Sequence, residues 1–199
     1  MTYKNIKLSL LSAALIGLLA IPTLNNILPQ YGLSMRLLIA FALFCLTLIG
    51  LAAFHFLSGW IQVFWQIAKF VVVGGLNTFL DFAVLNVLIA FTGIAAGIGF
   101  TLFKAVSFSV AVINSYYWNK FWTFEARGRN KAEFVEFLVV SLVGVGINVG
   151  VASAMVNLVE PLFGLGPVAW ANLAALVATF VALTWNFLGY KLLVFRKRS

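Results

Sequence analysis

The sequence has very few charged residues for its length. Only 9% of its 199 residues are Asp, Glu, Lys or Arg, whereas about a quarter of the residues of a soluble domain are charged. Hydrophobic residues make up 63%, and the mean hydropathy is +1.08. A soluble globular domain needs a largely polar surface, which this composition does not supply. The sequence therefore predicts a membrane protein.

The residue types that carry most enzyme chemistry are also scarce. The chain has five acidic residues, one histidine and one cysteine, Cys45, so it offers no paired carboxylates, no nucleophile beside a base and no cluster with metal-ligand spacing. It also has no glycine-rich loop of the kind that cradles a phosphate. We therefore expect a protein that is not an enzyme and that uses no metal and no other cofactor.

Long apolar runs are what the sequence does have. A membrane-spanning helix needs about 20 predominantly apolar residues. Such runs occur at residues 8–28, 37–59, 70–91, 98–118, 135–158 and 168–189. They lack the period-two alternation of barrel strands, and lipid admits only helices or closed barrels. The prediction is an all-α membrane protein with about six transmembrane helices.

The basic residues predict how the helices are oriented. Short loops rich in Lys and Arg stay in the cytoplasm. With the N-terminus inside and six spans, Arg36 lies outside and Lys104 lies within a helix. The cytoplasmic side then collects Lys4, Lys7, Lys69, Lys120, Arg127, Arg129, Lys131, Lys191, Arg196, Lys197 and Arg198. This predicts an N-in, C-in, multi-pass protein of the cytoplasmic (inner) membrane. Because the basic residues form short clusters beside the membrane, we expect no nucleic-acid binding.

The chain contains an internal repeat. Residues 70–128 align without a gap with residues 141–199 at an offset of 71 residues. The offset pairs Gly75 with Gly146, Asn77 with Asn148, Lys120 with Lys191 and Phe124 with Phe195. Each copy holds two helices, so both copies enter the membrane in the same direction. The sequence thus predicts a parallel two-helix repeat of helices 3–4 and 5–6.

Small and polar residues share helix faces within the repeat. Gly74 and Gly75 in the first copy, and Gly144, Gly146 and Gly150 in the second, predict close approach between helices. At about 100° per residue, polar residues line one face of each of two helices. These residues are Asn77, Thr78 and Asp81 over 70–91 and Lys104, Ser107, Asn114, Ser115 and Trp118 over 98–118. Such stripes are either packing seams or the lining of a polar path.

Asp81 and Lys104 are charged residues deep inside predicted spans. Asp81 lies about 16 Å along its helix from Phe70, near the midplane of the bilayer. A charge there costs about 2.5–3.5 kcal/mol on insertion scales. Two interpretations follow. The pair either neutralises itself and fixes helix packing, or Lys104 meets an anionic headgroup while Asp81 tunes or releases it.

Residues 113–124, INSYYWNKFWTF, gather aromatic rings around Lys120. Trp and Tyr favour the headgroup level of a membrane, where a lysine reaches lipid phosphates. One interpretation is an anchor at the cytoplasmic end of the fourth helix. The other is an anchor that also serves as a loading platform for a substrate.

Three segments resemble the GtrA-like family of small membrane proteins: KFVVVGGLNTFLDFAVLNVL (69–88), KAVSFSVAVINSYYWNKFWTF (104–124) and WNFLGYKLLVF (185–195). The similarity covers residues 62–199, which predicts a GtrA-like four-helix domain there and a two-helix extension over 1–61. The resemblance implies a role in cell-surface polysaccharide synthesis or glycosylation. Members of the family are proposed to flip polyprenyl-phosphate-linked sugars from the cytoplasmic to the outer leaflet.

This resemblance gives the polar and basic residues a joint role in binding such a lipid. The implied path consists of Asn77, Thr78, Asp81, Lys104, Ser107 and Asn114. Lys120 and Lys191 would capture the phosphate at the cytoplasmic entrance, and Trp118 and Trp122 would stack on the sugar.

Two other functions fit the sequence. The chain is either a membrane scaffold for a polyprenyl-phosphate glycosyltransferase, which it would hold through the basic loop at 125–134, or a small proton-coupled exporter that uses Asp81. Six short helices enclose a narrow path, so a homodimer would supply further walls.

Overall fold

The described part of the chain is helical throughout in the computed structural model. The structure describes residues 2–28, 30–94, 97–126, 131–162, 164 and 167–196. Within these ranges it does not describe the side chains of residues 26, 27, 97, 100, 101, 104, 131, 149, 152, 153, 156, 157, 167–176 and 179. The described residues form six α-helices, two π-helical turns and no strand. The prediction of an all-α protein is confirmed.

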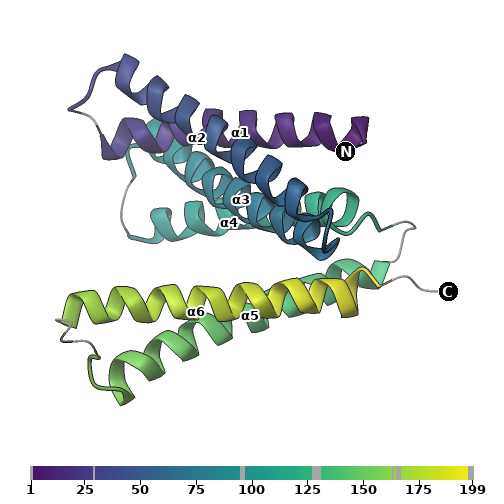
Figure 1. The fold of residues 1–199 in the computed structure, drawn as a ribbon. Helices are drawn as coiled ribbons and strands as arrows, with labels where there is room; N and C mark the ends of the chain where they lie inside the picture. Colours follow the sequence, from purple (N-terminus) through teal and green to yellow (C-terminus); the bar gives the residue numbers. More distant parts are fainter. Residues whose placement is uncertain are drawn as a thin grey trace. The chain divides into compact units, whose positions relative to one another are not determined.

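The six helices follow the six predicted apolar runs. They are α1 (Tyr3–Ile27), α2 (Leu33–Leu57), α3 (Val63–Thr92), α4 (Gly97–Trp118), α5 (Lys131–Leu158) and α6 (Pro167–Gly189) (Figure 1). The π-helical turn η1, Asn119–Thr123, continues α4, and η2, Tyr190–Val194, continues α6. The shortest helix has 22 residues and the longest 30, which corresponds to lengths of about 33 to 45 Å.

Within the described ranges, three segments are clearly long and apolar enough to cross a membrane. They are Tyr3–Asn25, Leu33–Leu57 and Val63–Thr92. A shorter apolar stretch, Phe180–Val194, runs through α6 and η2. The chain is therefore a membrane protein with transmembrane helices. The count of six spans and the N-in, C-in orientation stay predictions.

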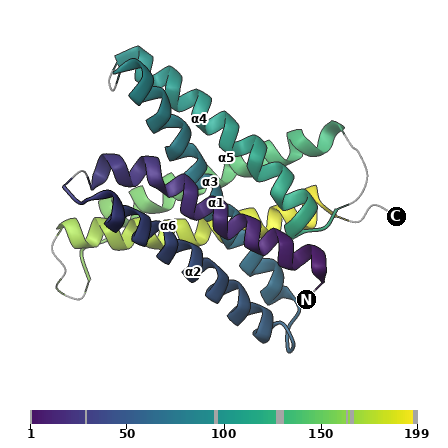
Figure 2. The same cartoon turned by 90° about the horizontal axis from the view of Figure 1, so that it is seen from above.

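The chain divides into two compact units, Met1–Glu125 and Ala126–Ser199. In the first unit, α3 is the central helix, because it packs against α1, α2 and α4 (Figure 2). In the second unit, α5 packs along α6 and also contacts η2. The predicted boundary between residues 61 and 62 falls at the turn between α2 and α3, inside the first unit.

The core of the first unit lies where α2, α3 and η1 meet. Leu51, Ala68, Val73 and Trp122 form a buried cluster, against which Leu8 of α1 packs. Burial of these side chains joins the end of α4 to the start of α3, which are far apart in the sequence. The basic residues near these helix ends are thereby brought into one region.

The core of the second unit is built around an aromatic pair. The rings of Phe137 on α5 and Tyr190 in η2 stack with their centroids 4.5 Å apart. The Tyr190 hydroxyl also forms a hydrogen bond of 2.7 Å with Ser141 Oγ. Both rings are almost fully buried, so this pair holds η2 against α5.

The glycines predicted to permit close helix contacts behave differently from one another. A Cβ atom added at Gly144 would collide with the Asn186 side chain, so α5 and α6 approach closely there, as predicted. At Gly74, Gly75, Gly146 and Gly150 an added Cβ would meet no atom within 4 Å. The predicted close approach at these four positions was therefore wrong, because α3 and α5 present them to open space.

Candidate functional site

Four polar side chains meet between α3 and α4. Asn114 Nδ2 donates a hydrogen bond of 2.7 Å to Asn77 Oδ1. Ser107 Oγ donates one of 2.6 Å to Asp81 Oδ1. Ser107 is fully buried and the other three are partly buried. We call Asn77, Asp81, Ser107 and Asn114 the polar seam.

The spacing of the polar seam explains why these residues meet. Asn77 and Asp81 are four residues apart and share one face of α3, while Ser107 and Asn114 are seven residues apart and share one face of α4. The antiparallel course of the two helices pairs the first residue of one set with the last of the other. The polar stripes predicted from the sequence thus face each other in the first unit.

The polar seam contains two hydrogen-bond donors, from Asn114 and Ser107, and two acceptors, from Asn77 and Asp81. A hydrogen bond between membrane helices contributes about 0.6 kcal/mol on average and up to about 2 kcal/mol. Two such bonds fix α3 against α4, which is the packing role expected of the stripes. An amide and a carboxylate on the same helix face can also exchange their partners for the polar groups of a ligand.

Of the two remaining residues of the predicted path, Thr78 lies outside these contacts and the side chain of Lys104 lies outside the described residues. Thr78 is exposed, and its hydroxyl donates to Gly74 O at 3.1 Å within α3. Lys104 belongs to α4, but its side chain lies outside the described residues. A direct pair between Asp81 and Lys104 therefore stays a prediction.

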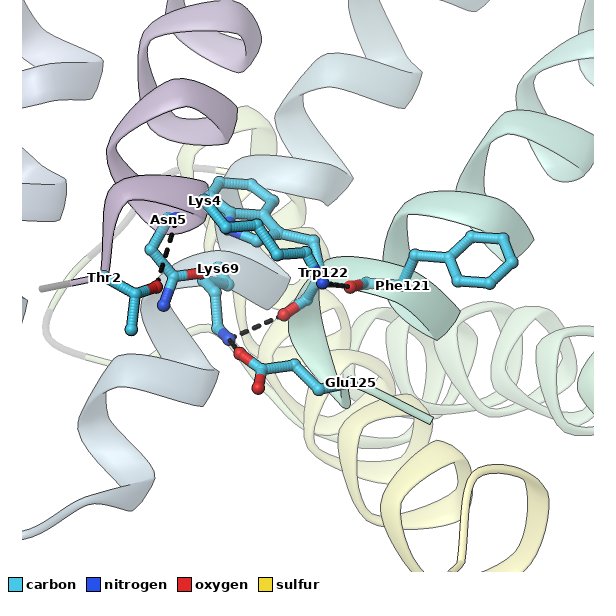
Figure 3. Close-up of polar contacts among 7 residues, drawn as sticks. All are labelled: Thr2, Lys4, Asn5, Lys69, Phe121, Trp122 and Glu125. Carbon is cyan, nitrogen blue, oxygen red and sulfur yellow. Dashed lines mark hydrogen bonds and ion pairs between the residues drawn. The ribbon is translucent and has the colours of Figure 1, made fainter. Parts of the chain in front are cut away.

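Two lysines bind backbone carbonyls at the end of η1. Lys69 Nζ donates to Trp122 O at 2.6 Å, and Lys4 Nζ donates to Phe121 O at 3.0 Å (Figure 3). The last carbonyls of a helix have no partner within the helix and carry the negative end of its dipole. Two ammonium groups therefore neutralise the end of α4 and η1.

These contacts also place three helix ends together. Lys4 stands at the start of α1, Lys69 near the start of α3, and both reach the end of η1. Arg36 lies at the start of α2, where it donates to Asn25 Oδ1 at 2.7 Å near the end of α1. Within the first unit, the lysines thus occupy the opposite end of α1 from Arg36, as the predicted orientation requires.

Glu125 completes the contacts around Lys69. Its carboxylate forms an ion pair of 3.0 Å with Lys69 Nζ, and the side chain is 55% exposed while that of Lys69 is only 2% exposed. Glu125 has a φ of +50°, in the left-handed region that residues other than glycine rarely adopt. The residue thus turns the chain away from η1 and covers Lys69.

The aromatic run at 113–124 divides between an inner and an outer face. The rings of Tyr117 and Phe121 are about half exposed and stack with centroids 6.1 Å apart. Trp122 is 1% exposed, and Trp118 packs on it with centroids 5.3 Å apart. The outer rings suit an anchor at the membrane surface. The two tryptophans expected to stack on sugar instead pack against the core of the first unit.

The two lysines predicted at the entrance occupy the same place in η1 and η2. Lys120 is buried, and its Nζ contacts Tyr116 Oη at 3.2 Å. Lys191 is partly buried, and its Nζ lies 5.6 Å from the centre of the Phe187 ring. Each lysine therefore lies beside the aromatic ring four residues earlier in its helix.

The two π-helical turns also match each other. Phe124 N donates to Asn119 O at 2.9 Å, and Phe195 N donates to Tyr190 O at 2.8 Å. The turns begin at residues 119 and 190, a separation of 71 residues (190 − 119) that equals the offset of the sequence repeat. This agreement supports a duplicated helix pair, while its parallel insertion stays a prediction.

From the sequence, Lys4 and Lys69 were used only to predict the orientation in the membrane, and Glu125 was not predicted to have a role. A signal for Lys69 was present, since it stands directly before an apolar run, where a lysine reaches the ends of neighbouring helices. The 71-residue offset gives a second signal, because one residue before the aligned repeat it pairs Lys69 with Val140 of α5. A charge found in one copy alone points to a task of that copy.

Two comparisons with known proteins concern the part of the chain that carries these sites. A family model described as GtrA/DPMS, transmembrane domain, matches residues 69–195. The match begins at Lys69 and includes the polar seam and both π-helical turns, and it confirms the resemblance found in the sequence. The uncharacterized membrane protein YngA of Bacillus subtilis (strain 168) is 28% identical over 130 residues, which covers 65% of this chain and 78% of YngA.

Proposed function

Because the chain belongs to the GtrA/DPMS transmembrane-domain family, which links it to the handling of polyprenyl-phosphate sugars, we propose that it flips a polyprenyl-phosphate-linked sugar across the cytoplasmic membrane. The lipid would pass from the cytoplasmic to the outer leaflet, for use in cell-surface polysaccharide synthesis or glycosylation.

The polar seam is the observation that carries this proposal. The lipid has a long apolar tail, a phosphate and a polar sugar, and only the last two need shelter from hydrocarbon. A row of polar groups along one helix pair supplies that shelter, while the tail stays in the surrounding lipid. On α3 this row begins at Asn77, about 12 Å from Lys69 along the helix axis, and Asp81 lies one turn further.

The position of the lysines fits the start of such a path. Lys69 and Lys4 meet where α1 and α3 begin and η1 ends, and Lys120 belongs to η1 itself. Under the N-in, C-in orientation this is the cytoplasmic end, where the lipid would enter. Ammonium groups attract phosphate there, and the polar seam takes over deeper in the bilayer.

The proposed process makes and breaks no covalent bond. Its energetic task is to lower the cost of moving a phosphate and a sugar through hydrocarbon, which hydrogen bonds from protein achieve. The chain is thus proposed to be a transporter and not an enzyme, without a cofactor. A homodimer would add walls to the path, and a membrane glycosyltransferase that makes or uses the lipid is a proposed partner.

Leaflet exchange in vesicles tests the proposal. The purified protein is reconstituted with a fluorescent polyprenyl-phosphate sugar, and its exposure on the outer leaflet is followed with a membrane-impermeant quencher. We expect Asp81→Ala and Lys104→Ala to slow exchange at least about tenfold, because a barrier higher by about 1.4 kcal/mol is sufficient. Ser109→Ala, on the exposed face of α4, is the matched control and should exchange normally.

Unchanged exchange in both charge variants would remove the proposed path. If vesicles with the native protein show no exchange at all, while cells that lack the protein lose surface glycosylation, the scaffold alternative would be favoured.

A further inference from the structure

The contacts around Lys69 have features of a binding site that the polar seam does not include. Lys4, Lys69 and Glu125 converge on the last carbonyls of η1 (Figure 3). They come from α1, α3 and the residue that follows η1 closely. None of them belongs to the predicted path, so their joint position is a property of the tertiary structure.

The charges of this group do not balance. Lys4 and Lys69 bind the carbonyls of the neighbouring residues Phe121 and Trp122, and the one carboxylate of the group, Glu125, pairs with Lys69. One positive charge is therefore left without a compensating anion among these three residues. Because the Lys69 side chain is buried, where charges are screened weakly, such an excess favours binding of a further negative group.

Glu125 is placed to yield its position to an incoming anion. Its side chain is 55% exposed, whereas that of Lys69 is 2% exposed, so the carboxylate covers the ammonium group on the open side. Its backbone φ of +50° is unfavourable for a residue with a side chain. Backbone strain of this kind is often found where a contact has to be released during function.

The surroundings contain a further donor without a partner. Trp122 Nε1 is buried and has no hydrogen-bond partner in the described part of the chain, although Trp122 supplies the carbonyl that binds Lys69. Asn5 Oδ1, one residue after Lys4, is likewise buried without a partner there. A buried polar group without a partner is unfavourable. Phosphate oxygens accept hydrogen bonds, so an anionic ligand suits the Trp122 donor, whereas the Asn5 oxygen would need a donor.

We propose that Lys69 and Lys4 form a phosphate site in which the Glu125 carboxylate is an internal stand-in that the ligand displaces. This inference rests on the proposed function, from which it takes the phosphate to be that of a polyprenyl-phosphate lipid. A phosphate oxygen replaces Glu125 on Lys69 Nζ, and Lys4 balances the remaining charge. Release of Glu125 frees the turn after η1.

Binding measurements on purified protein test the site separately from transport. Polyprenyl phosphate is titrated into the full-length protein in detergent by calorimetry, with neutral polyprenol and inorganic phosphate as comparison ligands. We expect Glu125→Gln to tighten binding of the lipid phosphate about fivefold, because the competing carboxylate is lost. Glu160→Gln removes the same charge from an exposed position outside this group and should leave the affinity unchanged.

Loss of the cations should act in the opposite direction. Lys4→Met changes an exposed side chain and is expected to weaken binding of the lipid phosphate several-fold without affecting polyprenol. If Glu125→Gln leaves the affinity unchanged or lowers it, or if it tightens polyprenol equally, the stand-in is refuted. Equal tightening for inorganic phosphate would assign the site to free phosphate instead.

The site and the proposed function can fail independently. If the binding shifts occur as expected but vesicles show no leaflet exchange, the phosphate site stands and flipping is wrong. If exchange occurs while Glu125→Gln and Lys4→Met bind the lipid as the native protein does, flipping stands and this site is wrong.

Discussion

Ser107 and Ser109 stand two residues apart on α4 but have different surroundings. Ser107 is fully buried and donates to Asp81 on α3. Ser109 is exposed, and its hydroxyl donates to Ala105 O in its own helix at 2.8 Å. The same residue type is thus part of the polar seam at one position and is a local helix contact at the other.

This difference predicts unequal effects of two identical substitutions. Ser107→Ala should lower the free energy of unfolding by about 1 kcal/mol, because it removes a hydrogen bond between helices from Asp81. Ser109→Ala should change it by less than about 0.5 kcal/mol. Thermal unfolding in detergent micelles measures both, and equal losses would mean that the contact between Ser107 and Asp81 does not stabilise the helix pair.

At the scale of the elements, the two helix pairs end in the same kind of turn but are stabilised by different contacts. The π-helical turns end α4 and α6 at equivalent positions, yet lysines bind the last carbonyls of η1 from α1 and α3. The α5 and α6 pair relies instead on close approach at Gly144 and on the Trp185 Nε1 hydrogen bond to Val140 O, 3.0 Å long. The two helix pairs therefore share a pattern of turns but not the contacts that hold them.

The contact at Gly144 predicts a specific sensitivity of α5. Gly144→Ala should lower the free energy of unfolding by about 1–3 kcal/mol, since the added Cβ collides with Asn186. Gly146→Ala is the matched control, because nothing lies within 4 Å of a Cβ there. It should be neutral or raise stability by up to about 1 kcal/mol. Similar unfolding temperatures for the two variants would contradict the close packing of α5 on α6.

At the scale of the whole molecule, the distribution of charge predicts orientation in the membrane. Gln62 lies in the turn between α2 and α3 and Glu160 in the loop after α5, and both are exposed. Under the N-in, C-in arrangement with six spans, the first faces the cytoplasm and the second faces outward, because lysines and arginines keep short loops inside.

Labelling of single cysteines in intact cells tests this arrangement. In a Cys45→Ser background, a membrane-impermeant maleimide should label Glu160→Cys in intact cells and Gln62→Cys only after the membrane is opened. The reverse result would invert the topology and with it the proposed direction of transport. Labelling of both positions from outside would contradict the number of spans.

Helix periodicity in the sequence predicted most of the residues of the polar seam. Asn77, Asp81, Ser107 and Asn114 fall on predicted polar faces, since the helical period fixes which residues share a side of a helix. Helix periodicity could not predict which of these residues form hydrogen bonds with each other, because the pairing depends on how far α3 is shifted along α4. For the same reason the sequence could not foresee that Gly74 would face open space while Gly144 would pack tightly.

The sequence by itself determined that this is a membrane protein, that it is helical, approximately where each helix lies, and to which family it belongs. These properties follow from composition, from the length of apolar runs and from local spacing, which need no knowledge of distant contacts. Only the tertiary structure decided that Trp122 is enclosed by the core, and that Lys4, Lys69 and Glu125 share the end of η1. Those side chains are far apart along the chain, and only packing of α1 and α3 against η1 brings them together.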